Sequence, residues 1–180
     1  MSCGCSNRVI IGAMSESQVN VAVELTAASS AIDITPAYAA GDALCAVQTL
    51  DCVVDTNIRT ARLTDILITE YKASGSHQKP ALELLFFGKS GVTATKNSAF
   101  TFSDTVVDAY KYLGSVTIAT ADYLVVGDVA YIRKSGLDMP VRNEDATPDT
   151  TVYVLPVITA GTPDFDTGAV MRMKFTFVQN

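Results

Sequence analysis

The chain has 180 residues, of which 48% are hydrophobic and 18% are charged, and its formal net charge is −6. A chain of that length can bury a hydrophobic core without disulfides or metals, so we expect one ordered domain. Its excess negative charge gains little from a polyphosphate, which argues against direct nucleic-acid binding. No run approaches the roughly 18 consecutive apolar residues of a membrane span, and the first eight residues do not resemble a secretory signal. We therefore expect a protein that is made in the cytoplasm and has no membrane partner.

Strands are predicted wherever apolar and polar side chains alternate, because successive strand residues point to opposite faces. The clearest cases are Val19–Leu25 near the start and Met171–Phe177 near the end. Nine further candidate strands lie between them: Ala31–Ile34, Ala43–Leu50, Thr60–Tyr71, Ala81–Phe87, Ala99–Phe102, Ser115–Ile118, Tyr123–Val126, Val129–Lys134 and Thr151–Thr159. Ala81–Phe87 is apolar on both faces, which predicts burial on both sides, in a sandwich or against a second subunit.

The spacing of these segments predicts the fold class. Strands recur every ten to fifteen residues with turn residues between them, which favours an all-β, antiparallel β-sandwich, jelly-roll-like, over alternating strands and helices. One short helix is predicted from the cap at Ser103 and Asp104 through Leu113, ended by Gly114. We assign residues 17–180 to the sandwich domain and 1–16 to an N-terminal arm, with 138–149 as a long polar loop.

The four cysteines do not form a recognisable metal or redox site. Cys3 and Cys5 form a C-x-C without a second Cys or His pair at zinc-finger spacing, and His77 is the only histidine. Cys45 lies in an apolar run and Cys52 adjoins one. We expect both to be small buried hydrophobic residues in a reducing compartment.

No residue combination indicates catalysis. His77 lies in the polar loop 74–80, where we expect a solvent-exposed turn histidine, because a catalytic base must be held rigidly beside its nucleophile. The chain has no nucleophile elbow, no zinc-protease motif, no phosphate-binding loop and no dinucleotide fingerprint. We therefore assign no catalytic, cofactor-binding or metal-binding residue, expect no cofactor, and predict that the protein is not an enzyme.

Two groups of carboxylates were weighed as sites. Asp164 and Asp166 form a D-x-D, while Glu144, Asp145 and Asp149 cluster in the polar loop. Neither group has the ligand spacing of an EF-hand, and neither shows the arrangement that a glycosidase needs. Aspartates favour turns because their side chains accept hydrogen bonds from nearby backbone amides, and this role is the interpretation we adopt.

The aromatic residues favour structural roles. Phe100 and Phe102 are predicted to lie in the core, since no stripe of Lys or Arg accompanies them, and Tyr110 and Tyr112 at a rim with their hydroxyls in water. A glycan-binding module would need an exposed aromatic beside Asp or Asn in a loop. Phe165, between two aspartates, is the only candidate.

The order of several segments resembles a broad group of tailed-phage virion structural proteins. The likeness runs from about Ser17 to the C-terminus. The segments that carry it are Ile32–Leu44, Ala81–Phe87, Ala99–Asp104 leading to Tyr112–Gly114, Thr151–Val157, Gly161–Pro163 and Val170–Asn180. The Cys-rich start falls outside it, which leaves the role of the arm open.

The resemblance implies a β-sandwich subunit of the virion, with a capsid decoration (cement) protein as the leading role. Such a subunit would lie on the capsid exterior, often as a homotrimer, with its arm across neighbouring copies of the major capsid protein. Three alternatives stay open: another virion component such as a tail, neck or head fibre; a carbohydrate-binding β-sandwich module for host recognition; and a hydrolase that uses loop carboxylates.

Overall fold

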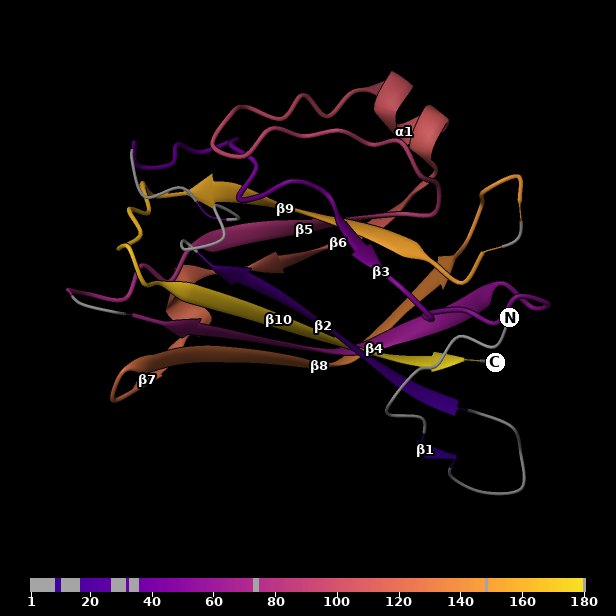
Figure 1. The fold of residues 1–180 in the computed structure, drawn as a ribbon, viewed down its shortest axis with the longest axis horizontal. Helices are drawn as coiled ribbons and strands as arrows, with labels where there is room; N and C mark the ends of the chain where they lie inside the picture. The colour runs from indigo at the N-terminus through magenta and orange to yellow at the C-terminus, as the bar shows by residue number, and fades with distance from the viewer. Residues whose placement is uncertain are drawn as a thin grey trace.

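The computed structural model describes residues 9–10, 17–26, 32, 36–72, 75–147 and 149–179. These residues form two facing antiparallel sheets, and 52% of the chain is strand (Figure 1). The elements are β1 (Val9–Ile10), β2 (Ser17–Thr26), β3 (Gln48–Leu50), β4 (Thr60–Tyr71), β5 (Ala81–Phe87), α1 (Asp104–Tyr110), β6 (Tyr112–Ile118), a 3-10 turn (Thr120–Asp122), β7 (Leu124–Val126), β8 (Val129–Arg142), β9 (Val152–Ala160) and β10 (Val170–Gln179).

The strand order is that of a jelly roll. The large sheet runs β1-β2-β10-β4-β8-β7 and the small sheet β3-β9-β5-β6. With β1 and β7 set aside, the first strand pairs with the last, β3 with β9, β4 with β8, and β5 with β6. Rolling up one long antiparallel hairpin produces this nested pairing. The prediction of an antiparallel, jelly-roll-like sandwich is confirmed.

The main core lies between the two sheets. On β10, Met171, Met173, Phe175 and Phe177 are fully buried and Arg172 and Lys174 are exposed, as their alternation predicts, while Thr176 is buried and donates to Asn20 on β2. The ring of Phe86 on β5 meets that of Phe175 edge-on, with centroids 5.8 Å apart. Aromatic pairs prefer this geometry, which joins the centres of the two sheets.

A second apolar cluster covers the outer face of the small sheet. Leu85 and Phe87 on β5 point away from the main core, and Val92 packs against them from the long connection 88–111 between β5 and β6. This connection, which we call the cover, closes at its base where the Gly88 amide donates to the Lys111 carbonyl at 2.9 Å. β5 is therefore buried on both faces, as predicted, and on the outer face the chain's own cover buries it.

Gly88 is required where the cover leaves β5. A Cβ there would lie 2.5 Å from the carbonyl oxygen of Arg142, closer than real Cβ atoms come. The Gly88 carbonyl also accepts from the Glu144 amide at 2.6 Å. Only glycine permits this approach of two backbones, which fastens the cover to the end of β8.

Some boundaries differ from the prediction. The helix begins after its cap Ser103, as expected, but ends at Lys111, which takes the left-handed conformation with φ 53°. Gly114 instead lies inside β6. The segment 99–102 forms only an isolated bridge between Ala99 and Asp42, because it belongs to the cover, and of 43–50 only Gln48–Leu50 is a strand.

The polar loop and the arm also differ. β8 continues to Arg142, so the connection to β9 is shorter than the predicted loop 138–149. Of the predicted strand 31–34 only Ile32 is described, and it is buried. Of the predicted arm 1–16 only Val9–Ile10 is described; it pairs with the start of β2 as β1, and the rest lies outside the described residues.

Of the predictions for Cys45 and Cys52, the first is confirmed and the second is wrong. Cys45 is a buried free thiol, and burial raises its pKa to about 12. Cys52 is disulfide-bonded, so its assignment as a reduced, buried hydrophobic residue is wrong. Its φ of 61° places it in the turn after β3 and not in a packed strand. Its partner lies outside the described residues, as do Cys3 and Cys5.

Candidate interaction surfaces

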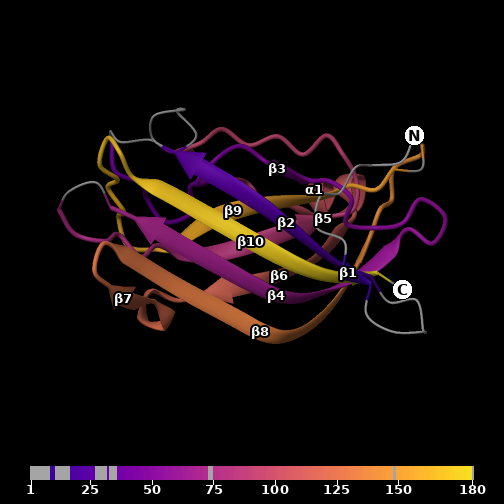
Figure 2. The same cartoon turned by 60° about the horizontal axis from the view of Figure 1, so that its bottom comes forward.

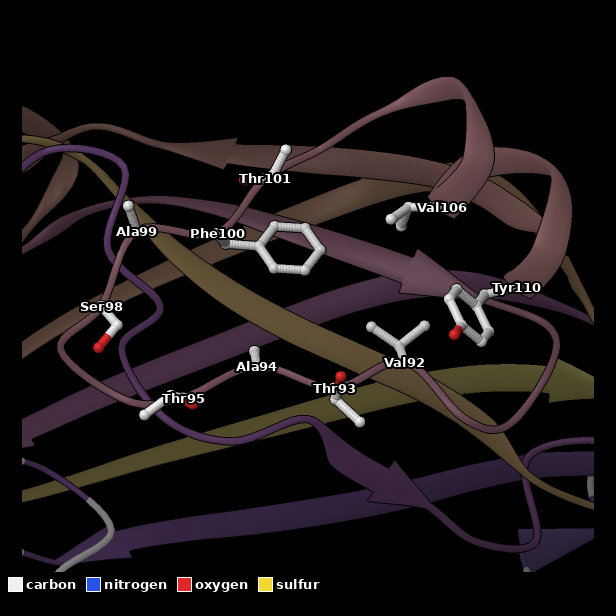
Figure 3. A pocket seen from close by; sticks show the side chains of 10 residues that line it. All are labelled: Val92, Thr93, Ala94, Thr95, Ser98, Ala99, Phe100, Thr101, Val106 and Tyr110. Carbon is white, nitrogen blue, oxygen red and sulfur yellow. The ribbon is translucent and has the colours of Figure 1, made fainter.

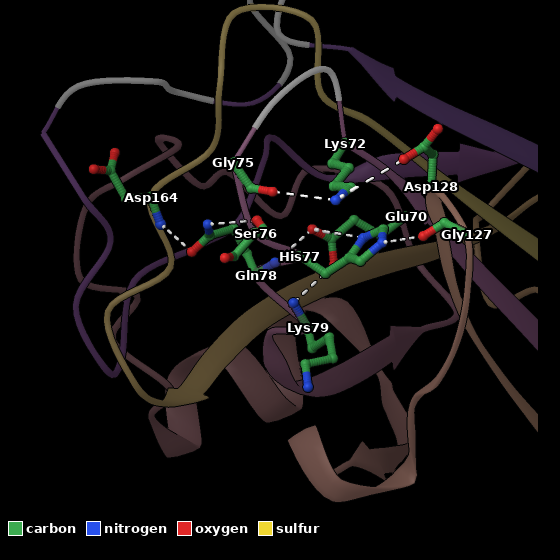
Figure 4. Close-up of polar contacts among 10 residues, drawn as sticks. All are labelled: Glu70, Lys72, Gly75, Ser76, His77, Gln78, Lys79, Gly127, Asp128 and Asp164. Atoms are coloured by element: carbon green, nitrogen blue, oxygen red, sulfur yellow. Dashed lines mark hydrogen bonds and ion pairs between the residues drawn. The ribbon is translucent and has the colours of Figure 1, made fainter.

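His77 is buried and not solvent-exposed, which corrects the sequence prediction. Its side chain is only 6% exposed and lies against the Glu70 carboxylate, with Nδ1 3.9 Å from Oε1 (Figure 4). Its Nε2 lies 3.4 Å from the Gly127 carbonyl oxygen, in the turn between β7 and β8. The loop before β5 folds back onto the sheet, and the histidine joins that loop to the hairpin.

Glu70 explains why this loop is held. It is the penultimate residue of β4, and it is only 1% exposed. Its two carboxylate oxygens accept from the backbone amides of Gln78 at 2.6 Å and Lys79 at 2.7 Å. Lys79 takes a positive φ of 45°, a conformation that side chains other than glycine rarely adopt. The buried carboxylate compensates that strain, because it satisfies two amides at once.

Two buried polar atoms near Glu70 have no partner within the described residues: Nδ1 of His77 and the hydroxyl of Tyr123. Burial raises the pKa of Tyr123, and the Glu70 and Asp122 carboxylates raise it further. Tyr123 is therefore a neutral phenol at physiological pH. The printed contacts of His77 and Glu70 join the loop to β4 and to the turn after β7, which supports a structural role for the loop contact.

Asp149 has the predicted turn role, whereas the contacts of Asp145 and Asp166 are of other kinds. Asp149 accepts from the Thr150 amide at 2.6 Å, and Asp145 accepts from the Ser90 hydroxyl at 2.8 Å, which ties the cover to the loop before β9. The Asp166 carbonyl oxygen accepts from two backbone amides in the turn before β10. Within the described ranges no three His, Cys, Asp or Glu side chains lie in an arrangement that could hold a metal ion.

The aromatic predictions are partly wrong. Phe165, the candidate glycan platform, is 2% exposed and packs edge-on against Tyr38, so it offers no face to a sugar. Phe102 was predicted to lie in the core, but it is 46% exposed. Its ring packs edge-on against that of Tyr112. Phe100 is half-buried and packs on the cluster beneath the cover, as expected.

A cavity of about 320 Å³ opens in the cover. Phe100 points toward Val106 and Tyr110 across it, with Val92 below them (Figure 3). No charged side chain lines it, and its polar groups are the hydroxyls of threonines, a serine and Tyr110. The walls suit an uncharged apolar group and leave nothing to bind an ion.

The outer face of the large sheet carries paired charges, and no segment that the structure describes packs over it. Arg133 lies 2.7 Å from Asp65, and Arg172 pairs with Glu24 while stacking over the Tyr71 ring at 5.3 Å. Beside this pair lies a shallow groove of about 370 Å³ with Lys174 on its wall. Cross-strand ion pairs of this kind add little stability at a surface, but they leave few unpaired charges.

One end of this face is apolar, and sequence reasoning missed it. The strand at 123–126 was predicted, but Leu124, Val125 and Val126 are 60%, 50% and 65% exposed. Alternation predicts that alternate residues of a strand are buried, and it gives no warning that a strand lies at a sheet edge. The signal that could have found it is the short spacing to β8, with Gly127 at the first turn position, which predicts a projecting hairpin.

Within the described residues, no helix has the length and apolar content to cross a bilayer. A scan against protein-family models gives no match, and a search of curated proteins gives none either.

Among solved structures, a chain of turnip yellow mosaic virus is similar at 11% identity over 93% of this chain and 82% of that chain, with a TM-score of 0.28. A chain of Desmodium yellow mottle tymovirus is similar at 13% identity over 94% and 90%, with a TM-score of 0.25. Both are weak structural neighbours and are virus capsid proteins. A likeness at these TM-scores supports no functional statement.

Proposed function

We propose that this chain is a structural subunit of a tailed-phage virion and acts there as a capsid decoration (cement) protein. The resemblance from about Ser17 onward implies this role, and the jelly-roll strand order agrees with it, because eight-stranded jelly rolls recur in viral capsid proteins. A fold does not determine a function. The observation that carries the proposal is the outer face of the large sheet, which no described segment covers and whose exposed apolar end and paired charges suit contact with another protein surface.

The physical logic is mass action. A subunit that binds only the expanded shell stabilises that shell in proportion to its affinity and concentration. It needs buried area and shape complementarity, and no reaction centre. Lectins also use the jelly-roll fold, and a glycan-binding site would need an exposed aromatic residue. Phe165 was the only candidate in the sequence, and its burial argues against this alternative.

The test is the composition and reconstitution of particles. Purified virions should contain this chain at a copy number fixed by capsid symmetry, and the purified chain should re-bind expanded capsids from which it has been stripped. Copurification with tails at a few copies per particle would show the cement role to be wrong and would favour another virion component.

The arm supplies a second test. Deleting residues 1–16 should weaken binding to stripped capsids while leaving the sandwich folded, because a tether adds affinity through effective concentration. The deletion also removes β1 and both cysteines that could pair with Cys52, so the melting temperature should fall while unfolding stays cooperative. Loss of the cooperative transition would instead show that this segment is part of the core.

A further inference from the structure

The turn after β3 carries a cysteine whose bonding partner can be identified by elimination. Cys52 is disulfide-bonded, and Cys45, the other cysteine of the sandwich domain, is a free thiol. The sequence has four cysteines, so the partner of Cys52 within this chain is Cys3 or Cys5. Both belong to the C-x-C at the start of the predicted arm, a motif that the proposed function does not use.

The turn that carries Cys52 is anchored on both sides. The side-chain amide of Gln179 donates to the carbonyl oxygens of Cys52 and Val53, at 3.0 and 3.1 Å. The Val54 amide donates to the Thr150 carbonyl at 3.1 Å. Val53 and Val54 are fully buried, whereas Cys52 is only partly buried. The side chain of Cys52 is therefore held in a fixed place near the surface, where a second cysteine can reach it.

The predicted arm joins the sandwich at the same end of the large sheet. Gln179, at the end of β10, lies opposite Ser17, at the start of β2, and the Ser17 hydroxyl donates to its side-chain oxygen at 2.8 Å. Ile10 on β1 pairs with Ser17 in turn. Figure 2 shows β1, the start of β2 and the end of β10 together at this end. Gln179 thus connects the place where the arm attaches to the turn that carries Cys52.

The covalent reach of the chain allows either cysteine of the C-x-C to meet Cys52. An extended chain spans at most about 3.5 Å per residue, so Cys5 lies within about 18 Å of Ile10 and Cys3 within about 25 Å. The two positions differ by only two residues. Whichever of them is bonded, the other is a thiol beside the disulfide, which is the arrangement that thiol–disulfide exchange needs.

We propose that Cys3 and Cys5 share an exchangeable disulfide with Cys52, and that reduction of this bond releases residues 1–8 from the sandwich. To form the bond, two thiols become one disulfide and pass two electrons and two protons to a low-molecular-weight disulfide, which becomes two thiols. In exchange, the free thiolate of the C-x-C attacks Cys52 Sγ, a new bond to Cys52 forms, and the displaced cysteine leaves as a thiolate. That step consumes no oxidant. The inference does not depend on the virion role.

Cys45 takes no part in this exchange. It is 1% exposed, and burial raises the pKa of its thiol to about 12, so it supplies almost no thiolate at neutral pH. The chemistry is therefore confined to the C-x-C and Cys52. In a reducing compartment these thiols stay reduced, and in an oxidising medium the bond forms. The oxidation state thus decides whether the first residues of the chain are tied to their own domain.

Trypsin reports the bond directly, because Arg8 is the only Lys or Arg before Arg59. The full chain is equilibrated with oxidised or reduced glutathione, unfolded, alkylated and digested. In the oxidised chain the peptide of residues 1–8 should stay attached to the peptide of residues 9–59, and two of the four cysteines should be alkylated. In the reduced chain the first peptide should be released and all four alkylated. Cys45→Ala, the matched control, should keep the link.

Variants of the C-x-C test the exchange. Cys3→Ser and Cys5→Ser should each keep the link through the remaining cysteine, and the double variant should lose it and leave Cys52 as a free thiol. Loss of the link should lower the melting temperature by roughly 5–15 °C, because a bond that closes about 50 residues restricts the unfolded chain. A 1–8 peptide that is released from the oxidised wild type, or a Cys52 that is joined to a second chain, would overturn the proposal. A link that only one of the single variants keeps would overturn the exchange.

Discussion

The outer faces of the two sheets differ in how far they are shielded from water. On the small sheet, Leu85 and Phe87 point outward, and the cover 88–111 buries them within the same chain. On the large sheet, the outer face carries paired charges, and at β7 it ends in exposed apolar residues, with no described segment packed over it as the cover packs over the small sheet. The chain thus covers the apolar outer face of the small sheet with its own residues, whereas the charged outer face of the large sheet needs no such cover to fold. Contacts with partners are accordingly expected on the large sheet.

The largest expected effect compares how much stability the cover and the sandwich core each gain from the apolar side chains that they bury. Phe86 and Phe87 are adjacent, both are fully buried, and they point to opposite faces of β5. Phe86→Ala and Phe87→Ala should each lower the free energy of unfolding by about 3–5 kcal/mol, with Phe87 at the lower end because the cover collapses more readily. Chemical denaturation measures both. Phe102→Ala, a control on the exposed side of the cover, should cost less than about 1 kcal/mol.

If Phe87→Ala costs less than about 1 kcal/mol, the cover does not exclude water and the comparison fails.

Cysteine reactivity sharpens the same comparison. The pKa of Cys45, raised to about 12, leaves roughly a thousandfold less thiolate at pH 8 than an ordinary cysteine has. Alkylation of the native protein should therefore be very slow at Cys45. A cysteine placed at Val92 beneath the cover should react faster, because a connection opens locally more often than a core does. Equal rates at the two positions would show that cover and core open together.

A moderate effect comes from the same substitution on each sheet. Glu70→Gln replaces an acceptor with a donor in front of a backbone amide, which cannot reverse its role, and should cost about 1–3 kcal/mol. Glu83→Gln on β5 should cost less than about 0.5 kcal/mol, because its donors are the hydroxyls of Ser115 and Thr117, which rotate to accept instead. Thermal unfolding compares them. Equal costs would contradict the anchoring role of Glu70.

The smallest effect is a pH dependence at the exposed edge. The Lys134 ammonium at 2.6 Å lowers the pKa of Asp122, and the Ala119 amide lowers it further. A carboxyl group whose folded pKa is lowered adds stability above its unfolded value of about 3.9 and loses it as pH falls through the folded pKa. The difference in melting temperature between the wild type and Asp122→Asn should thus shrink below pH 4. A difference that is constant down to pH 2 would exclude this ion pair as its cause.

Sequence pattern was enough for the sandwich because its signal is local. β4 and β5 match the predicted ranges, and β2 and β10 differ by a few terminal residues, since alternation reports directly which side faces a core. The two-sided burial of β5 was also visible. The sequence did not show whether the outer face of β5 is buried by a neighbouring subunit or by the chain itself, because the cover has no hydrophobic periodicity of its own.

The surfaces were less predictable, because they depend on tertiary neighbours. His77 lies among polar residues that are typical of an exposed loop, and only Glu70, seven residues earlier in the sequence but folded against it, makes the site buried. Phe165 lies between two aspartates, yet the edge-on contact with Tyr38 buries it. The exposed apolar residues of β7 lie at the edge of the large sheet beyond β8, a position that is known only once the sheet order is known.

The nested strand order has a consequence for biosynthesis. β10 follows the other nine strands in the sequence but lies between β2 and β4, and the Ser17 hydroxyl donates to Gln179 across 162 positions of sequence. Until β10 is synthesised, β2 has no neighbour toward the centre of the sheet, so a nascent chain that lacks β10 presents unpaired strand edges. Products truncated before β10 cannot close the sandwich. Synthesis of β10 thereby decides which molecules can fold and join a larger assembly.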